Sequence, residues 1–173
     1  KTLGVLGLGT LGSRVARVGQ AFEMTVLAWS QNLTREHASE VGATLVDRDE
    51  LLARADVVSI HLVLSERTRG LIGTRELGLM KPSAYLVNTS RGPIVDEAAL
   101  VHALRSGTIA GAGLDVFHEE PLPLDHPLRH LPNTVITPHL GYVTEETYRV
   151  FYGQAVQDIT AYLAGQPIRV LRP

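Results

Sequence analysis

The stretch LGVLGLGTLG, residues 3–12, decides the fold of this chain. An apolar run of strand length, Leu3–Leu6, leads into the turn GLGTLG, residues 7–12, and a helix-like stretch follows at residues 13–22. A strand, a G-x-G-x-x-G turn and a helix in this order form the dinucleotide-binding fingerprint. The stretch therefore predicts a nucleotide site at the start of a Rossmann-type sheet.

Each glycine of the turn has its own physical task in this motif. Gly7 permits the tight turn, Gly9 lets the backbone approach a pyrophosphate, and Gly12 lets helix and strand pack closely. The phosphates are then expected on the N–H groups at the helix N-terminus.

Composition narrows the class of protein. The chain has 173 residues, no cysteine and a formal charge of −2, which predicts one domain with its own core and excludes disulfide and cysteine–metal scaffolds. The lack of a basic run argues against nucleic acid or a membrane surface as the main partner. The histidine spacing predicts no metal site. We expect a cytoplasmic protein, and because Lys1 enters the first strand almost at once, we expect a fragment of a longer chain.

Strand-like and helix-like segments alternate along the sequence. Apolar runs of strand length lie at residues 25–29, 43–46, 57–62, 84–88, 109–114 and 134–137. Helical spacing occurs at residues 14–22, 33–41, 96–105 and 145–164. This alternation, with strands that are apolar almost throughout, predicts an α/β fold with a doubly wound parallel sheet.

Local signals mark the ends of some of these segments. Asp96 with the acidic residue after it predicts a helix N-cap, and Gly107 predicts a left-handed C-cap. Residues 119–132 hold four prolines and should form an irregular loop.

Polar residues follow the later strands. Arg91 lies after the run 84–88, Asp115 after the run 109–114, and His139 after the run 134–137. Ligands of open α/β sheets bind beyond the carboxyl ends of the strands. An arginine, an acid and a histidine are therefore expected to meet at one edge of the sheet.

At this point the chain resembles the D-isomer-specific 2-hydroxyacid dehydrogenase family. The resemblance covers nearly the whole chain and rests on five ordered motifs: GLGTLG, HLVLSERTRGLI, NTSRGPIVDEAAL, GLDVFHEEP and TPHLGYVTEE. It implies hydride transfer between a nicotinamide cofactor and C2 of a 2-hydroxy or 2-keto acid.

By motif position, the resemblance assigns Arg91 to substrate binding, Glu120 to orienting the base, and His139 to acid–base catalysis. Glu120 is chosen over Glu119 because the family's acid immediately precedes a proline. Imidazole titrates near neutral pH, a carboxylate orients it, and a guanidinium offers a planar fork to a carboxylate. Taken singly, each residue has an ordinary structural explanation as a surface ion pair or a loop side chain.

The resemblance also implies a set of cofactor contacts. It places Thr10 and Leu11 at the pyrophosphate, Thr68 near the adenosine, and Thr89 and Asp115 near the nicotinamide. His61 is expected to line the same cleft, with ordinary packing as the alternative, and strand-end capping is the alternative for Asp115.

The end of the second strand departs from the NAD-specific pattern. Ser30, Gln31 and Asn32 stand where such enzymes carry an acid for the ribose 2′-hydroxyl, and the nearest arginine is Arg35. These neutral groups predict weak discrimination between NAD and NADP, with a slight lean to NAD. Val63 and Tyr142 also depart from common family residues, and Tyr142 leaves substrate size open.

Residues 1–144 are expected to form the dinucleotide-binding domain, and residues 145–173 a helix and tail that return to a substrate domain absent from this chain. The chain alone should therefore bind cofactor but turn over poorly or not at all. Two alternatives stay open: an NADP-preferring glyoxylate or hydroxypyruvate reductase, and a nicotinamide-sensing module like the family's corepressors. By analogy with relatives, the full-length protein should be a homodimer.

Overall fold

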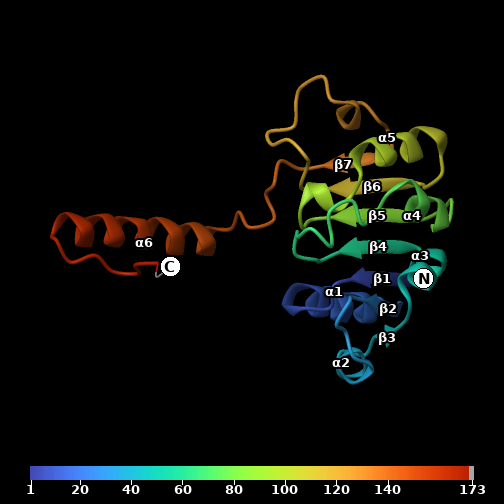
Figure 1. Cartoon of the computed structure of the whole chain (residues 1–173), viewed down its shortest axis with the longest axis horizontal. Coiled ribbons are helices and arrows are strands. Elements are labelled where there is room, and N and C mark those ends of the chain that lie inside the picture. Colours follow the sequence, from blue (N-terminus) through green and yellow to red (C-terminus); the bar gives the residue numbers. More distant parts are fainter. Residues whose placement is uncertain (172–173) are drawn as a thin grey trace. The chain divides into compact units, whose positions relative to one another are not determined.

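The computed structural model describes residues 1–171, which divide into two compact units, Lys1–His139 and a second that begins at Leu140. The first unit contains a seven-stranded, all-parallel sheet in the order β3-β2-β1-β4-β5-β6-β7 (Figure 1). Its strands are β1 (Thr2–Leu6), β2 (Thr25–Trp29), β3 (Thr44–Leu45), β4 (Val57–Ile60), β5 (Tyr85–Asn88), β6 (Gly111–Leu114) and β7 (Thr134–Ile136). The order reverses between β1 and β4, which is where such sheets bind nucleotides.

Helices connect successive strands of this sheet. They are α1 (Thr10–Ala21), α2 (Arg35–Glu40), α3 (Arg48–Arg54), α4 (Thr74–Leu79) and α5 (Glu97–Ser106), with short 3₁₀ turns η1 (Gly92–Ile94) and η2 (Pro127–Arg129). The second unit contains α6 (Glu145–Leu163).

Alternate residues of β1 enter two separate cores. Leu3 and Val5 of β1 pack with Ala16 of α1, whereas Leu6 packs in a cluster that includes Leu51 of α3. Successive side chains of a strand point to opposite faces of the sheet. The sheet is therefore covered on both faces, as the doubly wound pattern predicts.

The structure confirms the predicted strands to within a few residues. It also confirms the helix caps predicted at Asp96 and Gly107. The Asp96 side chain accepts a hydrogen bond from the Ala99 N–H at 3.0 Å, and Gly107 has a φ of 70°. Apart from η2, residues 119–132 form the expected irregular loop. The first helix begins at Thr10 rather than at residue 13 or 14, because helical geometry starts within the glycine motif, directly after Gly9.

Two helices were not predicted. α3 and α4 have seven and six residues, too few for an apolar period to repeat clearly. Their acidic first turns, Asp49 and Glu50 in α3 and Glu76 in α4, were the available signal.

The second unit contains α6 and a turn that follows it. Thr144 caps the helix by accepting from the Thr147 N–H at 3.1 Å. No residue of α6 is buried. Within residues 1–171, none of the helices has the length and apolar character needed to cross a bilayer.

Candidate active site

The β1–α1 turn is fixed by close backbone packing. Gly7 has a φ of 97°, and its N–H donates to the Trp29 carbonyl at 2.8 Å, which ties the turn to the end of β2. A Cβ at Gly7 would lie 2.6 Å from the His61 carbonyl oxygen, and one at Gly12 would lie 1.9 Å from the Gly7 oxygen. Both positions therefore require glycine.

Gly9 differs from these two glycines. A Cβ placed there would have no protein atom within 4 Å, so the residue borders open space at the N-cap of α1. No side chain caps α1, and the first N–H groups of a helix have no intrahelical acceptor. Thr10 and Leu11, both exposed, begin this helix. The turn therefore fits a pyrophosphate, as the fingerprint predicts.

A cleft at the ends of β4 and β5 brings several predicted residues together. A cavity of about 540 Å³ is lined by Leu11, His61, Thr89 and Arg91, together with Ser90 and residues 62–64. Its walls thus combine the glycine turn, the predicted nicotinamide contact and the predicted substrate arginine.

His61 has a partner that the sequence analysis missed. Its Nε2 lies 2.8 Å from the Ser59 Oγ, and burial lowers the pKa of His61 below its usual value. The imidazole is therefore neutral at pH 7 and suited to hydrogen bonding rather than to holding a charge. Ser59 and His61 are two residues apart near the end of one strand, so the shared face was the available signal.

The predicted base and acid are brought together across 19 positions of sequence. His139 Nδ1 lies 2.7 Å from Glu120 Oε2, and Glu120 Oε1 accepts from the Phe117 N–H at 2.9 Å. The backbone bond fixes the carboxylate, and the carboxylate in turn fixes the imidazole. The carboxylate that lies 2.7 Å from His139 is that of Glu120, the acid chosen from the sequence.

The pKa of Glu120 lies below its ordinary value. Burial raises this pKa, but the hydrogen bonds from His139 and Phe117 and the nearby charges of His139 and Arg91 outweigh it. The carboxylate is therefore ionised throughout the physiological range. The charge of Arg91 has the smallest of these effects on the pKa of Glu120.

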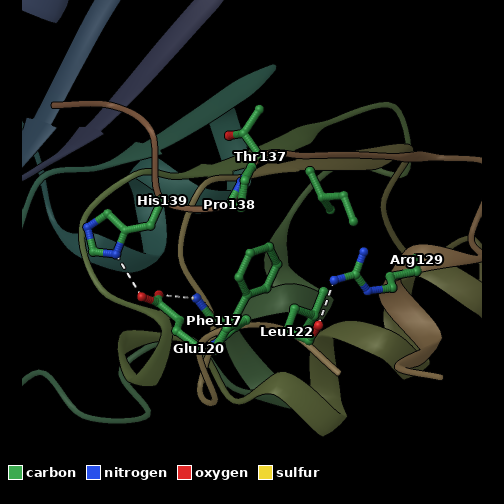
Figure 2. Close-up of a pocket in the computed structure, with 9 residues that line it drawn as sticks. Phe117, Glu120, Leu122, Arg129, Thr137, Pro138 and His139 are labelled. Carbon is green, nitrogen blue, oxygen red and sulfur yellow. Dashed lines mark hydrogen bonds and ion pairs between the residues drawn. The ribbon is translucent and has the colours of Figure 1, made fainter. Parts of the chain in front are cut away.

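A second cavity lies beside this pair. It has a volume of about 450 Å³ and is lined by residues that include Phe117, Leu122 and Ile136. Figure 2 shows the His139 ring turned toward the Glu120 carboxylate at one end and Arg129 at the other. The mostly apolar wall offers room for an organic side chain close to His139.

His139 also has an unusual backbone conformation. Its φ is 57°, in the left-handed region that side-chain-bearing residues rarely adopt. Such a conformation costs about 1–3 kcal/mol and is concentrated at functional sites. The fold therefore holds this histidine where a relaxed backbone would not.

The remaining predicted residues have local partners. Asp115 is buried and accepts a hydrogen bond from the Thr137 hydroxyl, which joins the ends of β6 and β7. The Thr68 hydroxyl accepts from the Ser65 N–H at 2.8 Å and donates to the Val63 carbonyl at 2.7 Å. Each therefore has a clear structural role, and their cofactor contacts stay predictions.

The two residues predicted at the end of β2 differ in their surroundings. Ser30 is partly buried and lines a cavity of about 270 Å³, whereas Gln31 is exposed and does not line it.

Comparison with known proteins agrees with this geometry. The family model described as "D-isomer specific 2-hydroxyacid dehydrogenase, NAD binding domain" matches residues 1–141. A glyoxylate reductase of Aeropyrum pernix is 49% identical over 166 residues, covering 96% of this chain and 50% of that protein.

Solved structures give the same result. An oxidoreductase from Ralstonia solanacearum superposes with a TM-score of 0.92 at 40% identity, covering 100% of this chain and 51% of that one. A D-lactate dehydrogenase with NAD⁺ from Lactobacillus jensenii gives 0.83 at 34% identity, covering 100% and 56%.

The chain spans about half the length of these relatives. The family match covers the sheet, the glycine turn and the His139–Glu120 pair. This chain therefore belongs to the D-isomer-specific 2-hydroxyacid dehydrogenase family, of which it contains the NAD-binding domain.

Proposed function

We propose that the full-length protein transfers a hydride between a nicotinamide cofactor and C2 of a 2-hydroxy or 2-keto acid. The observation that carries this proposal is the His139–Glu120 pair, held at 2.7 Å beside a cavity of about 450 Å³. When bound, the nicotinamide cofactor would supply the group that accepts the hydride from C2 of the substrate or donates it there.

In this proposal His139 exchanges the proton. Its Nδ1 is engaged by Glu120, so Nε2 is the atom that gives a proton to the carbonyl oxygen during reduction and takes it back during oxidation. The Glu120 carboxylate fixes the imidazole and stabilises its positive charge. The proton and the hydride together convert the C2 carbonyl to a hydroxyl.

Arg91 is proposed to hold the substrate. Its side chain is exposed at the cleft that also contains Thr89 and His61, and its Nη1 donates to the Ser90 carbonyl at 2.6 Å. That bond anchors one edge of the guanidinium while the planar group presents further donors to a carboxylate. In this proposal Arg91 binds the substrate carboxylate, and the substrate carbonyl receives its proton from His139 Nε2.

The experiment is NADH oxidation by the full-length protein with glyoxylate, hydroxypyruvate and pyruvate as probes. Turnover with at least one of them supports the proposal, and His139→Gln should lower kcat by about 100-fold or more, as expected for a lost general acid. His130→Gln is the matched control, because this histidine is exposed and lies outside both cavities.

No turnover with any probe, or equal activity of His139→Gln and wild type, would contradict the dehydrogenase assignment. Cofactor binding without turnover by the full-length protein would favour the corepressor-like alternative.

We also propose that the full-length protein is a cytoplasmic homodimer. The homodimer rests on the family resemblance, and the location rests on the composition of the chain. Light scattering of the full-length protein tests the homodimer, and cell fractionation tests the cytoplasmic location.

A further inference from the structure

The end of β2 lacks the acid that NAD-specific sites use to bind the adenosine ribose. Ser30, Gln31 and Asn32 offer neutral atoms only. A ribose 2′-hydroxyl is best recognised by a carboxylate, which also repels a 2′-phosphate.

A carboxylate reaches this position from the neighbouring strand. β3 pairs in parallel with β2, with Leu27 opposite Thr44 and Ala28 opposite Leu45. Continuing the register by two residues places Asp47 beside Ser30. The Val46 N–H donates to the Ala28 carbonyl at 3.2 Å, so the pairing extends past the assigned strand.

The two residues share a cavity. The cavity of about 270 Å³ at this edge is lined by Trp29, Ser30, Arg35, Leu45, Val46, Asp47 and Glu50. The Gly7 N–H bond to the Trp29 carbonyl connects this edge to the pyrophosphate turn. The cavity therefore lies where the adenosine end of a bound dinucleotide is expected.

Hydrogen bonding distinguishes the two acids of this cavity. Glu50 is paired with Arg54 one turn further along α3. Asp47 is exposed at the N-cap of α3, and its carboxylate makes neither a capping hydrogen bond nor an ion pair with any of residues 1–171. Asp47 is therefore the acid whose acceptor atoms are available to a ligand.

We propose that Asp47 accepts a hydrogen bond from the adenosine ribose of the cofactor and disfavours a 2′-phosphate, so that the acid which β2 lacks is supplied by the end of β3. This inference rests on the proposed function, because it assumes that a nicotinamide dinucleotide binds the β1–α1 turn. Arg35 lines the same cavity and weakens the selectivity without reversing it.

The test is calorimetric titration of the purified chain with NADH and with NADPH. The wild type should bind NADH more tightly, and Asp47→Asn should shift the ratio of the two dissociation constants toward NADPH by about tenfold, because one repelling charge is removed. Asparagine is also a good N-cap residue, so the variant keeps the helix start.

Asp49→Asn is the matched control. It removes the same charge from the same helix, but Asp49 is paired with Arg75 and does not line the cavity. In Asp49→Asn the ratio of the NADH and NADPH dissociation constants should stay within about twofold of the wild-type ratio. An unchanged ratio in Asp47→Asn, an equal loss for both cofactors, or a wild-type preference for NADPH would overturn the role of Asp47. No binding of either cofactor by wild type would instead overturn the proposed function, and this inference with it.

Discussion

Glu120 determines how the acid–base pair responds to pH. Its pKa is lowered in the folded chain, so its contribution to stability is present above the unfolded value of about 4.3 and is lost as the pH falls through the lower folded value. The free energy of unfolding of wild type minus that of Glu120→Gln should therefore be constant above about pH 5.5 and should decrease on acidification below about pH 4.5.

Urea unfolding of both proteins between pH 3 and pH 7 measures this difference. A difference that increases on acidification would contradict the assignment of Glu120 as an ionised partner of His139.

The left-handed backbone at His139 predicts an unusual order of stability. Glycine adopts a φ of 57° without steric cost, whereas alanine does not. His139→Gly should therefore be more stable than His139→Ala by about 1 kcal/mol, the reverse of the order in a helix. Thermal unfolding of the two variants measures the difference, and a more stable alanine variant would show that the backbone at this position is relaxed.

At the scale of the element, two glycines of the β1–α1 motif differ in what they support: Gly12 supports the stability of the fold, and Gly9 supports cofactor binding. Gly12→Ala places a Cβ 1.9 Å from the Gly7 oxygen and should destabilise the chain by about 2 kcal/mol or more. A Cβ at position 9 would lie in open space, so Gly9→Ala should keep most of the stability of the chain. Its NADH affinity should fall by about tenfold or more, because the added methyl group occupies the space expected for the phosphates.

Chemical unfolding and NADH titration of both variants check this pair. Unchanged NADH affinity in Gly9→Ala would show that the phosphates lie elsewhere.

The elements also show how far sequence reasoning extends. The buried strands could be predicted because continuous apolar runs identify strands covered on both faces, and the start of α5 because Asp96 caps it. α3 was missed because it is short, and with it the position of Asp47 at the end of β3. The His139–Glu120 contact could be predicted only through the resemblance, since the irregular loop 119–132 that joins them has no periodic pattern.

At the scale of the molecule, the catalytic side chains proposed here are accessible to water. The side chains of His139 and Glu120 are each 35% exposed, and Arg91 is exposed as well. Hydride transfer needs a site from which water is excluded. The 173-residue chain should therefore bind NADH but reduce glyoxylate at a rate about 100-fold or more below that of the full-length protein. Steady-state kinetics on both forms compare the rates, and equal kcat values would show that this chain completes the site by itself.

The most direct test of the whole account is a titration of the 173-residue chain with NADH, followed by energy transfer from Trp29. This residue is the single tryptophan of the chain and lies at the end of β2, on the wall of the expected adenosine cavity. We expect saturable quenching of tryptophan emission with sensitised nicotinamide emission, and in Gly9→Ala both signals should need an NADH concentration about tenfold higher or more. A wild-type chain that shows neither signal would contradict the claim that this domain binds a nicotinamide dinucleotide.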